Sequence, residues 1–175
     1  MNQGQNWVIF SQNEIYLKYG KDLENSLYIN GFKTVYISIP DGENAKSLKV
    51  MEGIFSKLLK ANCDRSSTFL ALGGGVVGDL TGFLASTFMR GVNYIQIPTS
   101  LLAIVDSSIG GKTGINTSEG KNFIGSIYQP QGVLVDPTIL NFLSNKIISW
   151  KDWLIFVLEI DLVQTYAIES FQTHK

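Results

Sequence analysis

The most informative segment of the chain is Leu72-Gly73-Gly74-Gly75-Val76-Val77-Gly78-Asp79-Leu80. It follows an apolar run at 68–72 that is typical of a buried strand. It precedes a segment at 79–89 whose apolar residues recur at helical spacing. Its glycines therefore form G-x-G-x-x-G between a strand and a helix, the context in which this spacing makes a dinucleotide-binding turn. The alternative is a glycine turn that serves packing alone.

Strands and helices alternate on both sides of this turn. Short runs rich in β-branched and aromatic residues predict strands at 7–10, 35–39, 68–72, 94–97 and 133–135. Helical spacing predicts helices at 15–30, 46–62 and 79–89, a short helix at 100–107, and a glycine- and lysine-bearing loop at 110–125. The alternation predicts an α/β fold with a Rossmann-like, doubly wound parallel sheet, whose ligands bind at the carboxyl ends of the strands.

Two departures from standard nucleotide motifs limit what the glycine turn implies. The acidic residue that holds the ribose usually lies about twenty positions after the turn, where Pro98 and Thr99 stand instead. Gly111-Lys112-Thr113 resembles the end of a phosphate-binding P-loop, but Asp106 occupies the position that requires a glycine. A P-loop nucleotidase is therefore disfavoured.

Isolated charges stand out in the glycine-rich part of the chain. Residues 66–135 hold 12 of the 17 glycines and six charged residues: Asp79, Arg90, Asp106, Lys112, Glu119 and Lys121. Glycines allow close approach of the backbone to a ligand, and charges in an apolar stretch need partners. The pattern predicts a small-molecule site that handles phosphate. The residues alone leave open whether Asp106 caps a helix or holds a ligand. They also leave open whether Lys112 and Lys121 bind phosphate or are solvated. For Arg90 they favour an interaction with the helix dipole.

The composition excludes several classes of protein. The chain has 175 residues, 45% of them apolar, with a net charge of −1, which favours a globular domain and argues against nucleic-acid or membrane-surface binding. Cys63 is the single cysteine and His174 the single histidine, so we expect no disulfide and no histidine-based metal site or triad. No basic-then-apolar leader and no run of ~18 apolar residues are present, and we expect a cytoplasmic protein.

Taken together, the motifs resemble the 3-dehydroquinate synthase family. The match runs without a break over about 7–143. It rests on 41–46 (Asp-Gly-Glu-Asn-Ala-Lys), 72–80, 89–91 (Met-Arg-Gly), 98–103 (Pro-Thr-Ser-Leu-Leu-Ala), 105–116 (Val-Asp-Ser-Ser-Ile-Gly-Gly-Lys-Thr-Gly-Ile-Asn), 119–122 (Glu-Gly-Lys-Asn), 128–130 and 133–136.

The resemblance implies an NAD-binding α/β domain at 1–143. In the family this domain precedes a helical domain that binds a divalent metal, zinc or cobalt. The implied activity is that of a lyase of the shikimate pathway for aromatic amino acids. With NAD it converts 3-deoxy-arabino-heptulosonate 7-phosphate to 3-dehydroquinate and eliminates phosphate. Residues 144–175 match no family motif, and we assign no metal ligand in this chain.

The resemblance also implies roles for individual residues. Asp106, Lys112, Asn122 and Arg90 correspond to substrate-site residues, Arg90 to one that reaches the substrate of a neighbouring subunit, which implies a homodimer. The implied cofactor residues are Asp41, Glu43, Lys46, Gly75, Val76, Val77, Gly78, Asp79, Thr99, Ser100, Lys112 and Lys121. Gln12 stands where the family has an acidic residue that contacts the adenine ribose.

The divergent segment 144–175 leaves three interpretations open. The first is a truncated synthase that is inactive, or nearly so, by itself. The second is a noncatalytic NAD-binding fragment or subunit, completed by a second polypeptide. The third is a related sugar-phosphate cyclase that acts on a different substrate.

Overall fold

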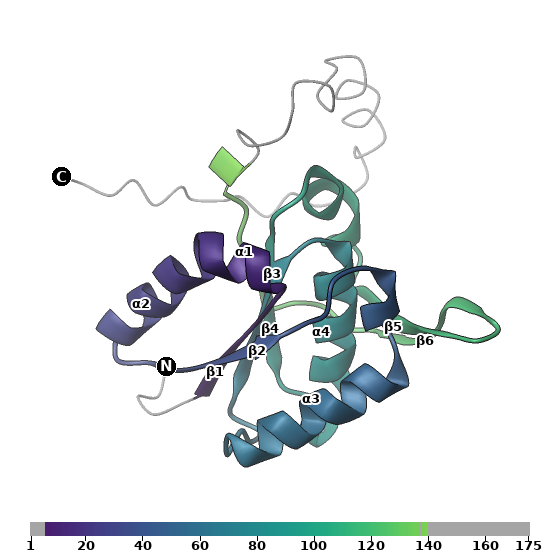
Figure 1. The fold of residues 1–175 in the computed structure, drawn as a ribbon, viewed down its shortest axis with the longest axis horizontal. Coiled ribbons are helices and arrows are strands. Elements are labelled where there is room, and N and C mark those ends of the chain that lie inside the picture. Colours follow the sequence, from purple (N-terminus) through teal and green to yellow (C-terminus); the bar gives the residue numbers. More distant parts are fainter. Residues whose placement is uncertain (1–5, 137, 140–175) are drawn as a thin grey trace.

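The core of the protein is a five-stranded parallel sheet. A computed structural model describes residues 6–136, 138 and 139 (Figure 1). The strand order is β2-β1-β3-β4-β7, and every neighbouring pair is parallel. The strands are β1 (Asn6–Ser11), β2 (Lys33–Ser38), β3 (Thr68–Gly73), β4 (Asn93–Pro98) and β7 (Gly132–Val133). The predicted strands and the parallel α/β class are confirmed.

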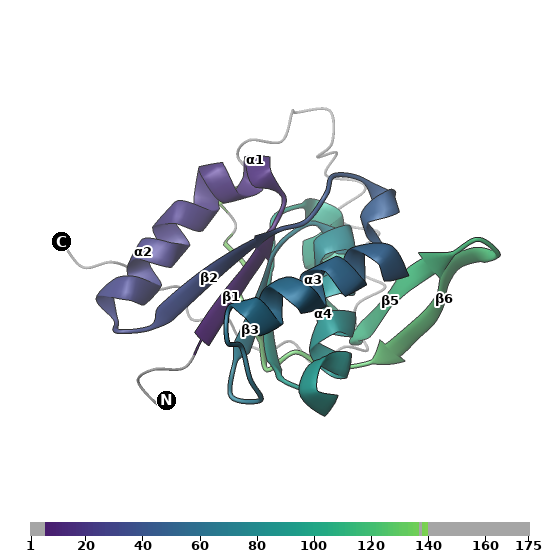
Figure 2. The same ribbon diagram turned by 60° about the horizontal axis from the view of Figure 1, so that its bottom comes forward.

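Helices cover both faces of this sheet, because alternate side chains of a strand point to opposite faces. Val8 and Phe10 join the apolar cluster under α3 (Leu48–Lys60) and α4 (Gly75–Thr87). Trp7 and Ile9 join a second cluster with the helical segment of α1 (Asn13–Ile15), η1 (Tyr16–Gly20) and α2 (Lys21–Ile29). Figures 1 and 2 show these two layers on either side of the sheet, as a doubly wound fold requires.

The helix predicted at 79–89 begins four residues earlier than expected. α4 starts at Gly75, with Gly74 in an extended conformation as its N-cap. The apolar residues at helical spacing begin only near Asp79, whereas residues 75–78 are glycine and valine. A glycine inside a helix costs only about 1 kcal/mol, so the helix can begin earlier than this spacing indicates. The helix ends at Thr87, and Met89 (φ 49°) and Arg90 (φ 70°) then turn the chain into β4.

The predicted loop at 110–125 is wrong, since this segment forms a β-hairpin. β5 (Lys112–Thr117) pairs antiparallel with β6 (Gly120–Ile127) across a two-residue connection. Ile115 is fully buried in the core cluster that includes α4. The glycines hid the alternation of β-branched residues in β5, which is the sequence signal of a strand.

The hairpin projects from the side of the domain (Figure 2). Ser126 ties its base to the body, since the Ser126 hydroxyl donates to Ser86 Oγ of α4 at 2.9 Å. Most of β6 is exposed, including Phe123 and Ile127, at 72% and 70%. β5 and β6 form a sheet of two strands, so among the described residues no further strand pairs with the outer edge of β6.

Three predictions concern parts of the chain outside the described residues. The proposed domain boundary at 143, the segment 144–175 and His174 lie beyond residue 139. Within the described part, no helix combines the length and the apolar character needed to cross a membrane.

Gly82 marks the contact between α4 and the hairpin, and it gives a test of the packing. A Cβ at Gly82 would lie 2.4 Å from Thr113 Cγ2 and 3.0 Å from the Tyr94 hydroxyl, whereas a Cβ at Gly53 in α3 would meet nothing within 4 Å. We expect Gly82→Ala to lower the unfolding free energy by about 1–2 kcal/mol, because overpacking outweighs the gain in helix propensity. The matched change Gly53→Ala should raise it by about 0.5–1 kcal/mol. Equal effects of the two changes in urea unfolding would contradict this packing.

Candidate functional site

The site lies at the carboxyl edge of the sheet, around the start of α4. The Thr99 N–H donates to the Gly73 carbonyl at 3.0 Å, which holds the ends of β3 and β4 together. Gly74 has no side chain to cap α4, so the first amide groups of this helix remain available to an anion. A Cβ at Gly75 would lie 3.1 Å from Ser107 Oγ, and a side chain there would fill the approach. These features fit the predicted phosphate-binding turn.

A cavity of about 550 Å³ opens beside this turn. Its walls come from α4, from η4 (Ala103–Ser107) and from both strands of the hairpin. Asp79, Asp106, Lys112 and Asn122 all line it. Four residues that the sequence assigned to cofactor or substrate therefore come together at one cavity, although they are spread over 44 positions of the chain.

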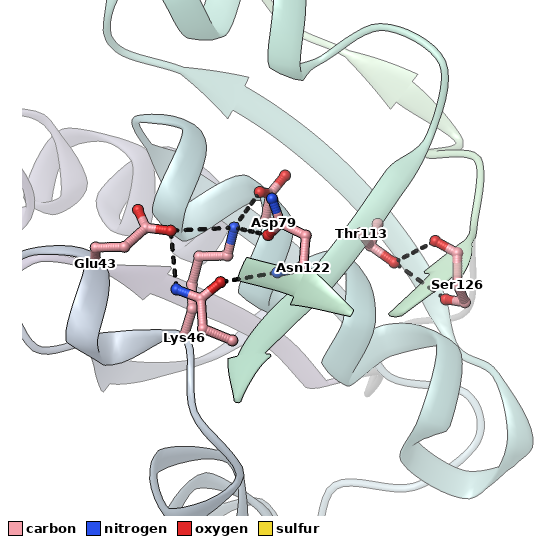
Figure 3. Close-up of polar contacts among 7 residues, drawn as sticks. Glu43, Lys46, Asp79, Thr113, Asn122 and Ser126 are labelled. Carbon is pink, nitrogen blue, oxygen red and sulfur yellow. Dashed lines mark hydrogen bonds and ion pairs between the residues drawn. The ribbon is translucent and has the colours of Figure 1, made fainter. Parts of the chain in front are cut away.

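The Lys46 side chain is the charged centre of the site. It is 3% exposed, and its Nζ lies 2.7 Å from Asp79 Oδ2 and 3.6 Å from Glu43 Oε1. The same ammonium donates to Asn122 Oδ1. Figure 3 shows the four side chains converging from η2 (Glu43–Ala45) and the residue after it, from α4 and from β6. A buried ammonium requires such compensation, so these contacts fix the three segments relative to one another.

Asn116 of β5 completes this arrangement, and the sequence interpretation did not single it out. Its Nδ2 donates to Glu43 Oε1 at 3.0 Å, and its Oδ1 accepts from the Asn122 N–H at 3.0 Å. Its own N–H donates to the Lys46 carbonyl at 2.9 Å. A hairpin with the two-residue connection 118–119 would have placed Asn116 close to Asn122, so the missed hairpin is the reason for the missed residue.

The two carboxylates have pKa values displaced in opposite directions. Burial raises the pKa of Asp79, and the Lys46 ammonium offsets this in part. The hydrogen bond from Asn116 lowers the pKa of Glu43, and the charge of Lys46 acts in the same direction. Glu43 is the more exposed partner, at 40%. At neutral pH the buried ammonium therefore faces two carboxylates of unequal ease of ionisation.

The remaining predicted cofactor residues lie at or near the same edge. Val76, Val77 and Gly78 form the first turn of α4. The Ser100 hydroxyl accepts from the Ala103 N–H at 3.3 Å and begins the next helical segment. Asp41 is exposed in the turn after β2.

Two further predicted residues are exposed and do not line the cavity. Lys121 is exposed on β6 and is not among the residues that line the cavity. Arg90 follows the C-terminal end of α4, the opposite end from the glycine turn, and its side chain is exposed. Their roles in cofactor and substrate binding stay predictions.

The described residues contain no group of three or more His, Cys, Asp or Glu side chains that could hold a metal ion. This part of the chain therefore does not fit the divalent metal that the family resemblance implies. The last 36 residues, which include Glu159 and His174, lie outside the described part.

Comparison with known proteins gives matches both in sequence and in structure. The N-terminal model of the 3-dehydroquinate synthase family matches residues 36–149. The 3-dehydroquinate synthase of Picosynechococcus sp. is 52% identical over 143 residues, which cover 82% of this chain and 39% of that protein. The enzyme of Clostridium kluyveri is 47% identical over 147 residues, covering 84% and 41%. The chain thus spans about two fifths of the length of these curated relatives.

Solved structures share the fold. A 2-epi-5-epi-valiolone synthase from Streptomyces hygroscopicus, with NAD+ and Zn2+ bound, superposes with a TM-score of 0.74 at 29% identity. The match covers 82% of this chain and 40% of that one. A 2-deoxy-scyllo-inosose synthase complexed with carbaglucose-6-phosphate, NAD+ and Co2+ gives a TM-score of 0.75 at 24% identity, covering 81% and 39%.

Removal of the Lys46 charge tests the electrostatics of the site. A raised folded-state pKa means that ionisation of Asp79 opposes folding, so this part of the stability is lost as pH rises through that pKa. Without Lys46 the pKa of Asp79 rises further. We therefore expect Lys46→Met to lower the unfolding free energy by about 3 kcal/mol near pH 7.5 and by less near pH 4.5, measured by urea unfolding.

The matched control is Lys49→Met, which removes an exposed lysine of α3. It should change stability by less than about 0.5 kcal/mol at both pH values. A Lys46→Met effect that is independent of pH would show that the ammonium does not compensate Asp79.

Proposed function

The chain belongs to the 3-dehydroquinate synthase family, and on this premise we propose that it forms the NAD-binding half of a 3-dehydroquinate synthase. The proposed reaction is the NAD-dependent conversion of 3-deoxy-arabino-heptulosonate 7-phosphate to 3-dehydroquinate with loss of phosphate. Because the chain spans about two fifths of its curated relatives, this activity belongs to the full-length arrangement. By itself the chain should be inactive or nearly so.

The proposal rests on one observation, that an anion-binding helix start and a charged cavity lie side by side. The uncapped start of α4 lies beside a cavity that holds an aspartate, a lysine and an asparagine, namely Asp106, Lys112 and Asn122. The first feature suits a diphosphate, and the second suits a hydroxylated anion. A glycine turn that served packing alone would require no charged cavity beside it.

We assign the nucleotide to the edge formed by β2, β3 and β4. The free amides of Gly75, Val76 and Val77 would hold the diphosphate. Gly78 would complete the turn without offering a free donor, since its N–H donates to the Gly74 carbonyl at 3.0 Å. Asp41, Glu43 and Lys46 would lie on the adenosine side, and Thr99 and Ser100 on the other. Lys46 would act mainly through its contacts with Glu43 and Asp79, because its side chain is buried.

NAD supplies hydride transfer when it is bound. Asp106 would accept a hydrogen bond from a substrate hydroxyl, and Lys112 would stabilise negative charge on substrate oxygen or phosphate. Asn122 would orient the substrate from the hairpin. Lys121 and Arg90 would contact phosphate from outside the cavity, Arg90 in a neighbouring subunit of a homodimer. No step is assigned to a metal, since the described residues do not fit one.

Two other functions of the same site remain candidates. The NAD+-bound 2-epi-5-epi-valiolone synthase, at 29% identity, favours a related sugar-phosphate cyclase as the second candidate. A noncatalytic NAD-binding subunit would keep the nucleotide edge alone. For each we propose a cytoplasmic location.

NAD titration by calorimetry tests the proposal directly. We expect saturable NAD binding by the wild-type chain and at least a tenfold weaker affinity in Gly75→Val, because the added side chain would meet Ser107 and fill the approach to the amides. Lys112→Ala should weaken NAD binding less than Gly75→Val does, and it should also weaken the binding of 3-deoxy-arabino-heptulosonate 7-phosphate to the NAD complex. Gly53→Ala is the control that leaves both unchanged.

The outcomes separate the candidates. No heat with millimolar NAD would overturn the nucleotide site itself. NAD binding without any response to the seven-carbon phosphate, but with a response to a six-carbon sugar phosphate, would favour a related cyclase. NAD binding with neither response would favour the noncatalytic subunit.

A further inference from the structure

Three hydrogen bonds and one ion pair join Glu43, Lys46, Asn116 and Asn122 into a closed ring. Lys46 Nζ donates to Asn122 Oδ1, and the Asn122 N–H donates to Asn116 Oδ1 at 3.0 Å. Asn116 Nδ2 donates to Glu43 Oε1 at 3.0 Å, and this same oxygen lies 3.6 Å from Lys46 Nζ. The ring joins the segment after β2 to both strands of the hairpin.

The position of Asn116 in the ring requires an amide side chain. It uses its oxygen as an acceptor and its nitrogen as a donor in the same ring. An aspartate of the same shape would keep the acceptor but lose the donor, and it would place a second negative charge against Glu43. An apolar residue would lose both contacts. The ring therefore depends on the chemistry of this side chain, and its shape alone does not suffice.

The contact with Asn116 also holds the backbone of Asn122. Asn122 has a φ of 58°, a left-handed conformation that is strained for most residues. Its N–H is held by Asn116 Oδ1, and its Oδ1 is held by Lys46. Its Nδ2 makes no hydrogen bond with the rest of the described chain. Because Asn122 lines the cavity, this amide nitrogen is the donor that the ring leaves for a ligand oxygen.

We infer that Asn116 is a positioning residue that orients Glu43 and Asn122 around Lys46, and that it thereby couples the nucleotide side of the site to the cavity side. The coupling rests on the proposed function, whereas the positioning does not. A ligand that moves Glu43 or Lys46 must change the hydrogen bond that orients Asn122. By linkage, the factor by which NAD changes the affinity for a ligand bound to Asn122 equals the factor by which that ligand changes the affinity for NAD.

The positioning is tested first without any ligand, by NMR on the wild type, Asn116→Ala, Asn116→Asp and the charge control Asn44→Asp. Asn44 is exposed and neighbours Glu43 in the sequence. In Asn116→Ala the Asn122 amide should exchange about tenfold faster, and the pKa of the Glu43 carboxyl should rise. In Asn116→Asp the Asn122 amide should keep its protection while the pKa of Glu43 rises further. Asn44→Asp should leave the exchange rate of the Asn122 amide unchanged, and it should raise the pKa of Glu43 less than Asn116→Asp does.

The positioning role would be overturned if a folded Asn116→Ala protein kept the wild-type exchange rate of the Asn122 amide and the wild-type pKa of Glu43. If Asn116→Ala does not fold, Asn116→Asp decides the matter, because it keeps the size and the acceptor. An unchanged Glu43 pKa in that variant, or a shift no larger than in Asn44→Asp, overturns the role equally.

The coupling is tested by NAD calorimetry with and without 3-deoxy-arabino-heptulosonate 7-phosphate as the probe. In the wild type the probe should change NAD affinity by about fivefold or more. In Asn116→Ala or Asn116→Asp the factor should fall below about twofold, and in Asn44→Asp it should stay at the wild-type value. The coupling is overturned if the probe changes NAD affinity as much in both Asn116 variants as in the wild type. It is also overturned if the probe leaves NAD affinity unchanged in a wild type that binds NAD. A wild type that binds no NAD overturns the proposed function and the coupling together, while the NMR measurements still decide the positioning role.

Discussion

The constraint on which this site depends is the compensation of one buried positive charge. The Lys46 ammonium is almost inaccessible to water, and an unpaired ion there would destabilise the fold by several kcal/mol. It is compensated by groups from the segment after β2, from α4 and from the hairpin. These three segments must therefore keep their relative positions. The cavity wall formed by Asn122 is a consequence of that requirement, because Lys46 holds the side chain of this residue.

The same charge explains how an anion site and a carboxylate can share one helix. The free amides at the start of α4 attract negative charge, yet Asp79 places a carboxylate at the fifth residue of that helix. Its contact with Lys46 at 2.7 Å neutralises much of this opposing field. The amide dipoles at the start of the helix can therefore attract an anion although Asp79 lines the adjacent cavity.

Most of the fold was readable from local patterns, because each strand of the parallel sheet is a short run followed within a few residues by polar residues, glycine or proline. The glycine turn after 68–72 and the charges at Asp106 and Lys112 also predicted the position of the site. The hairpin was not readable, since five glycines between 110 and 125 outweighed the β-branched residues of β5. Asn116 was missed with it. Its role depends on a long-range contact with Glu43, 73 positions away, for which local sequence holds no signal.

In the part of the chain that the structure describes, no strand pairs with the outer edge of β6, and this bears on how the polypeptide behaves in solution. The exposed backbone amides and carbonyls of this edge lie next to Phe123 and Ile127, and an open strand edge with apolar side chains is a template for adding strands of other molecules. The charges of Glu119 and Lys121 near the tip are a natural guard against this process. Colloidal stability of the chain therefore depends on a few exposed positions of one strand, whereas its folding depends on the buried core.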